Sequence, residues 1–107
     1  MKNDYGVVLD RNGYAPSVLQ GDLDRCYLCG GSAEKLDRHE VYPAANRQKS
    51  KALGLWVMLC HNSCHLYGVH QYAGLSYKLK EKAQRVAMEH YGWTTEDFIK
   101  HFGRNYL

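Results

Sequence analysis

The chain has 107 residues, with 14 Lys or Arg residues against 11 Asp or Glu residues and a formal net charge of +3. This length suits one small domain with a limited core, so a bound metal would add stability that packing supplies poorly. Neither a secretory signal nor an apolar run near the roughly 20 residues that cross a bilayer is found, so we expect no membrane segment and a cytoplasmic location.

The positive charge is concentrated in the middle of the chain. Residues 25–85 contain ten Lys or Arg residues and four acidic residues, whereas the segments on either side are net negative. A basic centre favours a polyanionic partner such as nucleic acid, although a solvated surface would explain the same charge.

The elements predicted in the first two thirds of the chain are short. In chain order they are a strand over 5–9, a turn over 10–16, a metal knuckle over 26–31, a strand over 36–42, a polar connector with a helical turn over 44–52, an apolar strand over 54–59 and the start of a helix over 61–67.

Two longer helices are predicted at the end of the chain. Apolar residues recur at helical spacing over 75–91, and Gly92 supplies the stop. Thr94 and Asp97 have the spacing of a capping box, which predicts a last helix over 95–102.

Two cysteine pairs form the strongest motif. Two residues separate Cys26 from Cys29, and three separate Cys60 from Cys64. Four thiolates in two closely spaced pairs match a tetrahedral structural zinc site, which would stabilise so small a fold directly. Because the second spacing is longer than usual, His61 could replace one cysteine. Four reduced, buried thiols are the alternative without a metal.

Histidines lie on the first strand of the central hairpin and beside the second cysteine pair. His39 lies on the strand over 36–42, His65 follows Cys64, and His70 lies five residues later. On a regular α-helix, positions five apart are about 140° out of phase, so His70 joins His65 only if the helix breaks. Gly68 permits such a break.

This layout of strand, strand and helix resembles the HNH endonucleases, and small phage-encoded HNH proteins in particular. The similar motifs are CYLCG, RHEV, ANRQKS, GLWVMLC, CH followed by VH, and FGRNYL, which together cover roughly residues 26–107. The resemblance implies an α+β fold with a zinc-stabilised ββα-metal, treble-clef-like core. It implies a single domain over 1–107, with an N-terminal extension over 1–25, the core over 26–72 and C-terminal helices over 73–107.

The resemblance also implies a metal-dependent endonuclease that hydrolyses DNA phosphodiester bonds. In the family, one strand residue binds a divalent metal and its neighbour is the general base that takes a proton from water. Carried onto this sequence, His39, His65 and His70 are the metal ligands and Glu40 is the base. In the other register His39 is the base, and Asp37 or Glu40 is a ligand.

Strand alternation bears on these registers. It places Asp37 and His39 on one face and Glu40 on the other, unless the strand bends where Pro43 allows a turn. A Glu with an unperturbed pKa of about 4.3 is also a weaker base than His. Both assignments therefore stay open from the sequence.

Polar residues in and near the connector complete the predicted site. Asn46 matches the phage subgroup, and we expect it to act in the catalytic site by bracing the connector. The predicted phosphate contacts are basic residues, whose alternative is a solvated loop: Arg38, Arg47, Lys49 and Lys51.

The expected cofactors are a structural Zn²⁺ and a catalytic Mg²⁺ or Mn²⁺, with Ni²⁺ or Zn²⁺ as alternatives at an imidazole-rich site. DNA is the expected partner, and a homodimer would let so small a domain cut both strands. Glu40 in the base position keeps a second interpretation open, namely a non-catalytic zinc-stabilised module that binds nucleic acid or interacts with host defence.

Overall fold

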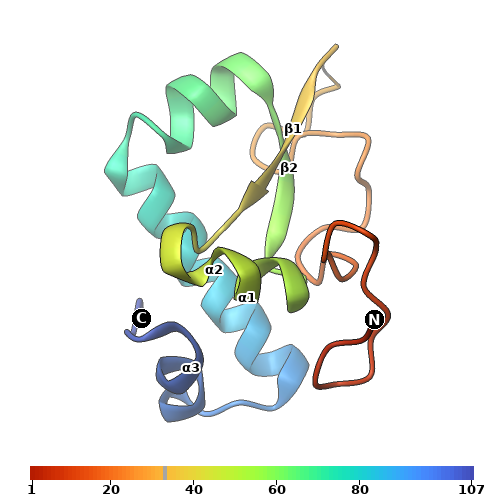
Figure 1. Cartoon of the computed structure of the whole chain (residues 1–107). Helices are drawn as coiled ribbons and strands as arrows, with labels where there is room; N and C mark the ends of the chain where they lie inside the picture. The colour runs from red at the N-terminus through yellow and green to blue at the C-terminus, as the bar shows by residue number, and fades with distance from the viewer. Residues whose placement is uncertain (33) are drawn as a thin grey trace.

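The computed structural model describes residues 1–32 and 34–107, which form a small α+β domain with a two-stranded sheet and helices (Figure 1). The elements, in chain order, are β1 (Leu36–Glu40), the 3₁₀ turn η1 (Ala44–Asn46), α1 (Arg47–Ala52), β2 (Trp56–Cys60), the π-helix η2 (His61–Val69), α2 (Ala73–Tyr91) and α3 (Thr95–Phe102). No helix in these residues is both long enough and apolar enough to span a membrane.

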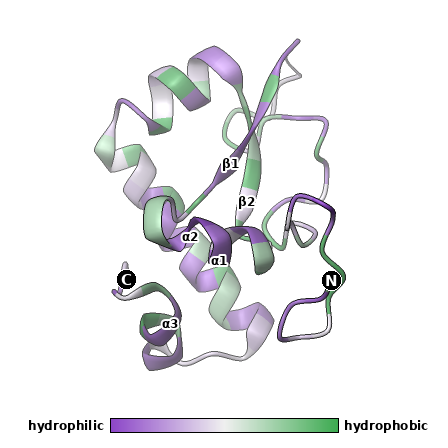
Figure 2. Ribbon diagram, in the orientation of Figure 1, coloured by the Kyte–Doolittle hydropathy of each residue, from purple (hydrophilic) through white to green (hydrophobic). Residues whose placement is uncertain are grey.

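The predicted central hairpin is confirmed. β1 and β2 pair antiparallel, with Leu36 opposite Cys60 and Glu40 opposite Trp56. Figure 2 shows hydrophilic residues along most of β1 and hydrophobic residues along β2. Val57 and Leu59 of β2 are fully buried, so β2 fixes the hairpin to the core and leaves β1 to carry polar side chains.

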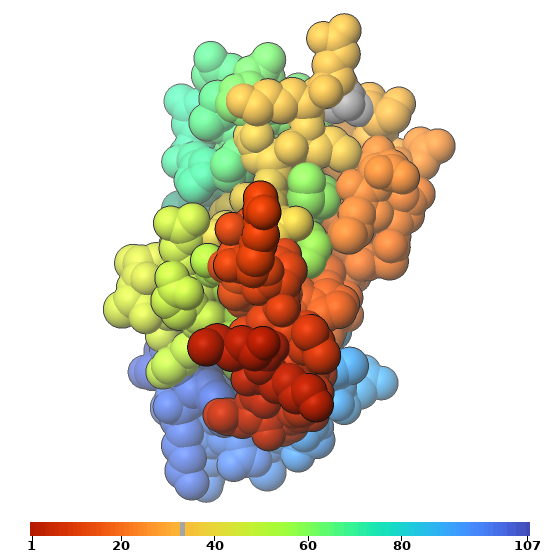
Figure 3. Space-filling view, turned by 45° about the vertical axis from the view of Figure 1, so that its right-hand side comes forward, coloured from red at the N-terminus to blue at the C-terminus, as the bar shows by residue number. Residues whose placement is uncertain are grey.

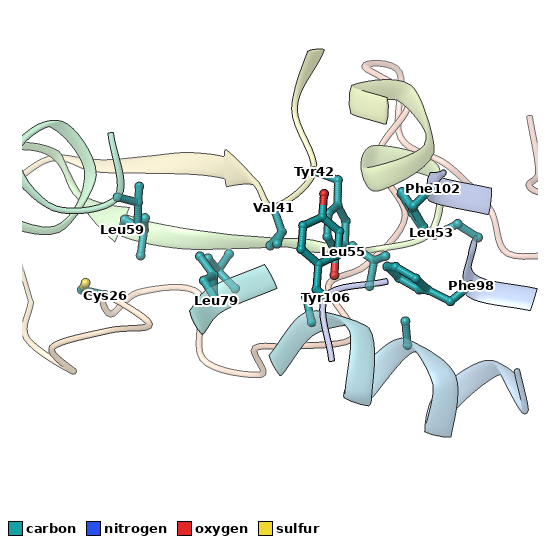
Figure 4. Close-up of a cluster of buried hydrophobic side chains, with 14 residues drawn as sticks. Cys26, Val41, Tyr42, Leu53, Leu55, Leu59, Leu79, Phe98, Phe102 and Tyr106 are labelled. Atoms are coloured by element: carbon teal, nitrogen blue, oxygen red, sulfur yellow. The ribbon is translucent and has the colours of Figure 1, made fainter. Parts of the chain in front are cut away.

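The core extends from the hairpin to the last helices. Figure 4 shows Cys26 at one end of this cluster and aromatic side chains at the other. The ring centroid of Tyr42 lies 4.6 Å from that of Phe102 and 5.3 Å from that of Tyr106. The Tyr42 hydroxyl donates to the Lys80 carbonyl at 2.6 Å, so this buried polar group is satisfied and joins the segment after β1 to α2.

The strand predicted over 5–9 is wrong. A single bridge pairs Lys2 with Val8, and the chain turns between them. Asn3 accepts hydrogen bonds from the backbone N–H groups of Tyr5 and Val7 through its side chain, and Gly6 has a φ of 76°. A side-chain acceptor and a glycine favour a turn over a strand.

The N-terminal extension over 1–25 packs against α1 and β2. Figure 3 shows its first residues on the same face of the molecule as α1 and the C-terminal helices, and beside them. The N–H of Ala15 donates to the Lys51 carbonyl and the Trp56 indole donates to the Ala15 carbonyl. At Gly54, with φ 74°, an added Cβ would lie 2.3 Å from the Pro16 carbonyl oxygen. Close contact of the extension therefore requires glycine there.

The two C-terminal helices match their predictions in kind and nearly in length. α2 begins two residues earlier than predicted and ends at Tyr91 as predicted, where Gly92 caps it in the left-handed conformation with φ 69°. At α3, the N–H of Asp97 donates to the Thr94 hydroxyl and the Asp97 carboxylate accepts from the N–H of Thr94, which confirms the capping box.

Replacement of Thr94 by Ala should lower the free energy of unfolding by about 1 kcal/mol, because the first turn of α3 loses its acceptor. Urea denaturation followed by circular dichroism measures the change. Thr95→Ala, at the first helical position, is the matched control, and an equal loss in both variants would show that the cap does not stabilise the domain.

Candidate functional site

Four cysteines form a cluster where the N-terminal knuckle meets the end of β2. The sulfur atoms of Cys26, Cys29, Cys60 and Cys64 all lie within 4.8 Å of one another, and these four residues are free thiols. A hydrogen bond of 2.8 Å from the N–H of Tyr27 to the Met58 carbonyl holds the knuckle beside β2. The cluster is positioned to hold a metal ion such as zinc.

Thiol acidity differs within this cluster. Burial acts to raise the pKa of Cys26, but backbone hydrogen bonds, chiefly from Cys29 and Cys60, hold it at about 6. Burial and hydrogen bonds with the other cysteines raise the pKa of Cys64. A thiolate-binding metal would displace the protons that remain on these sulfurs.

A second cluster consists of three histidines from the hairpin and η2. Ring nitrogens of His39, His65 and His70 lie within 4.8 Å of one another. The Nε2 atoms of His65 and His70 are 2.9 Å apart, and the ring of His39 meets both other rings edge-on. These three residues, predicted as one ligand set, are brought together.

His70 reaches His65 without a break at Gly68, because η2 is a π-helix that continues through Gly68 and ends at Val69. The N–H of His70 donates to the His65 carbonyl at 3.2 Å, five residues back. This bonding pattern defines a π-helix, in which residues five apart lie about one turn apart. The same spacing that separates two side chains on an α-helix aligns them here.

His39 is almost enclosed, with 7% of its surface exposed. Burial, and to a lesser extent the neighbouring rings of His65 and His70, lower the pKa of His39 to about 4. The ring is therefore neutral at physiological pH and has a nitrogen lone pair available for a metal.

Asp37 lies behind His65, on the same strand face as His39. Its Oδ2 atom is 2.8 Å from His65 Nδ1 and 2.5 Å from His61 Nδ1. Burial acts to raise the pKa of Asp37, but these two hydrogen bonds outweigh it and hold the pKa below the usual range. With Nδ1 bonded to a carboxylate, His65 presents Nε2 to His70.

His61 Nδ1 is engaged by Asp37, and the four-cysteine cluster is formed without His61, so the alternative in which His61 replaces a cysteine gains no support. The sequence suggested Asp37 only as a possible metal ligand and did not predict that it orients His65. Strand alternation, which places Asp37 and His39 on one face, was the signal that pointed to it.

Glu40 faces a different set of partners. Its Oε1 atom accepts hydrogen bonds of 2.8 Å from the Tyr14 hydroxyl and from Arg47 Nε. Burial acts to raise the pKa of Glu40, but these hydrogen bonds outweigh it and hold the pKa below the usual range for Glu. Tyr14 was not singled out from the sequence, because it lies 26 residues from Glu40 in the chain.

An open cleft of about 530 Å³ connects these groups. The residues that line it come from β1, the following turn, α1 and the region of η2: Arg38, His39, Glu40, Pro43, Ala44, Arg47, His65 and His70. The turn expected at Pro43 is present, and Ala44 has a φ of 57°, a conformation uncommon outside glycine. A three-histidine cluster at a cleft with arginines on its wall is an arrangement that can hold a cation and an anion together.

Comparison with known proteins adds nothing to this geometry. No family model, no curated protein and no solved structure matches the chain. Function must therefore be inferred from the two clusters and the cleft.

The predicted phosphate-binding residues divide into two groups. Arg38 and Arg47 line the cleft, and the Arg38 guanidinium also lies 4.1 Å from the Tyr14 ring centroid. Lys49 donates from Nζ to the His101 carbonyl at 2.6 Å, and Lys51 Nζ lies 4.7 Å from the centre of the Tyr14 ring. Both lysines are outside the cleft lining and contribute to the packing of α1.

Asn46 braces the connector, as expected for its residue type. Its Nδ2 atom donates to the Phe102 carbonyl at 3.0 Å. This bond joins the start of α1 to the last residue of α3 and places Asn46 outside the lining of the cleft.

Proposed function

We propose that the chain is a zinc-stabilised, metal-dependent endonuclease of the HNH type that hydrolyses DNA phosphodiester bonds. The observation that carries the proposal is the convergence of His39, His65 and His70 on one point of an open cleft. The order β1, β2, η2, with histidines on the first strand and on the helix, supports a ββα-metal core. A phage or prophage origin stays a prediction from the sequence resemblance.

The donor set fits a divalent metal. Three imidazole nitrogens lie close enough to share one ion. Because Asp37 is bonded to His65 Nδ1, the Nε2 atom of His65 is left to bind that ion. Imidazole ligands favour Ni²⁺ or Zn²⁺ over Mg²⁺ or Mn²⁺, which reverses the order of preference implied by the resemblance. A bound ion supplies Lewis acidity, which makes water more acidic and stabilises charge on phosphate oxygens.

The residues of the chain supply binding and orientation. His39, His65 and His70 would hold the ion, and Asp37 fixes the ring of His65 through Nδ1. The guanidinium groups of Arg38 and Arg47 add positive charge to the cleft, where a phosphodiester would bind. Because His39 converges with the other two histidines, the geometry favours His39 as a ligand over its role as the base.

A second candidate function is a non-catalytic, zinc-stabilised module that binds nucleic acid or interacts with host defence. The observation that favours it is Glu40, whose carboxylate is engaged by Tyr14 and Arg47. The basic centre of the chain would then serve binding alone.

Incubation of the protein with supercoiled plasmid and added Mg²⁺, Mn²⁺, Ni²⁺ or Zn²⁺ distinguishes these functions. Nicked or linear plasmid that requires a divalent ion is the expected result. Retarded plasmid on a gel, with no cleavage in any of these ions, would support the second candidate.

Asp37→Asn should weaken metal binding at the three-histidine cluster by about 10- to 100-fold, because partners of this kind orient a ligating histidine and raise its basicity. Isothermal titration with Ni²⁺ measures the affinity. His61→Ala removes the other hydrogen-bond partner of Asp37 and serves as the control. Equal affinity in wild type and Asp37→Asn would contradict the orienting role.

A further inference from the structure

Glu40 joins two side chains that come from distant parts of the chain. The Tyr14 hydroxyl, from the N-terminal extension, and Arg47 Nε, from α1, both donate to the same Oε1 atom. The side chain of Glu40 is 11% exposed, whereas that of Arg47 is 60% exposed. The acid is thus enclosed by its partners, and the guanidinium extends toward solvent.

The hydrogen bond from Nε determines which edge of the Arg47 guanidinium is free to contact a ligand in the cleft. A guanidinium has five N–H donors in a planar fork, and the Nε donor is directed at Glu40. Arg47 lines the same cleft as His39, His65 and His70. The donors on the outer edge of the fork match the paired oxygens of a phosphate group.

Strand alternation explains why Glu40 and His39 have different partners. His39 faces His65 and His70, while the next residue faces the N-terminal extension, where Tyr14 lies. The ring of Tyr14 is itself held edge-on against Trp56, with centroids 5.7 Å apart. Tyr14 is therefore a fixed donor, and it limits the positions that the Glu40 carboxylate can adopt.

We infer that Tyr14, Glu40 and Arg47 form a clamp that positions a DNA phosphate in the cleft, with Glu40 as a positioning residue that acts through Arg47. In this arrangement Glu40 does not remove a proton from water. The inference rests on the proposed nuclease function and names how that site recognises its phosphodiester. It also gives the N-terminal extension a role in the site.

The test combines DNA binding and cleavage kinetics for Glu40→Ala, Arg47→Ala and the double variant. Binding is measured by fluorescence anisotropy of a labelled DNA duplex without added divalent metal. Each single variant should weaken binding about tenfold, as expected for loss of a charge-assisted contact. The double variant should be no weaker than Arg47→Ala, because both changes remove the same contact. Arg85→Ala, an exposed charge on α2, is the control for net charge.

Cleavage by Glu40→Gln separates positioning from proton transfer. Gln keeps an acceptor for Tyr14 and Arg47 but loses the charge, so KM should rise about fivefold while the fall in kcat stays small. Tyr14→Phe should raise KM in the same direction by a smaller factor.

Two results would overturn the clamp. A Glu40→Gln variant that binds DNA but has lost kcat would make Glu40 the general base. Additive losses of DNA binding in the double variant would show that Glu40 does not act through Arg47. If the wild type binds DNA without cutting it, the proposed nuclease function fails, and the binding measurements alone still decide whether the clamp exists.

Discussion

Substitution of Cys60 by Ser is expected to unfold most of the domain. Cys60 ends β2 and directly precedes η2, so loss of a metal there separates the knuckle from the hairpin and releases the segment that carries His65 and His70. Structural zinc contributes about 10–16 kcal/mol in small zinc domains, against a net stability of about 5–15 kcal/mol for a typical domain. Circular dichroism and metal analysis of the purified protein measure both effects.

Wild type should contain about one tightly held zinc per chain, since one four-cysteine site holds one ion, and a strong chelator should unfold it. Asn62→Ala, an exposed neighbour of the cysteines, should keep both zinc and fold. A folded Cys60→Ser protein with the thermal stability of wild type, or a folded wild type without metal, would refute a structural role for the cluster.

Local patterns account for the parts of the fold that the sequence predicted. The members of each cysteine pair are close together in the sequence, so few residues are needed to define the geometry of the pair. The helices α2 and α3 carry their own periodicity, caps and glycine stops. β1 and β2 were predicted from an apolar run and the polar strand before it. In each case the pattern that predicts the element lies within that element or in the residues directly next to it.

Contacts between distant residues account for what the sequence did not show. Asp37 meets His65 across 28 positions and Tyr14 meets Glu40 across 26, and no spacing rule connects such pairs. Lys49 was expected at a phosphate, but its ammonium group donates to the carbonyl of His101, 52 positions away. The approach of His65 to His70 depended on the helix type, and residue spacing alone does not distinguish a π-helix from a broken α-helix.

His39→Ala is expected to reduce metal-dependent DNA cleavage by about 10³-fold or more, since metal ions supply several kcal/mol of charge stabilisation and each 1.36 kcal/mol is a factor of ten. His39 lies on β1, and it is the only one of the three proposed metal ligands that the hairpin supplies. Its loss would therefore remove the ligand that β1 contributes to the metal. Plasmid cleavage in the metal that supports the wild type, with the variant at equal concentration, measures the loss.

The variant must also be shown to fold, because His39 is buried and its removal leaves a cavity that lowers stability. Retained zinc and an unchanged circular dichroism spectrum would establish that the cysteine cluster and the helices are intact. His90→Ala, an exposed histidine on α2, should cut like the wild type. If a folded His39→Ala protein cuts at the wild-type rate, the three-histidine cluster is not the catalytic centre. The imidazole cluster would then have a binding or structural role, and the residues that cut DNA would lie elsewhere in the domain.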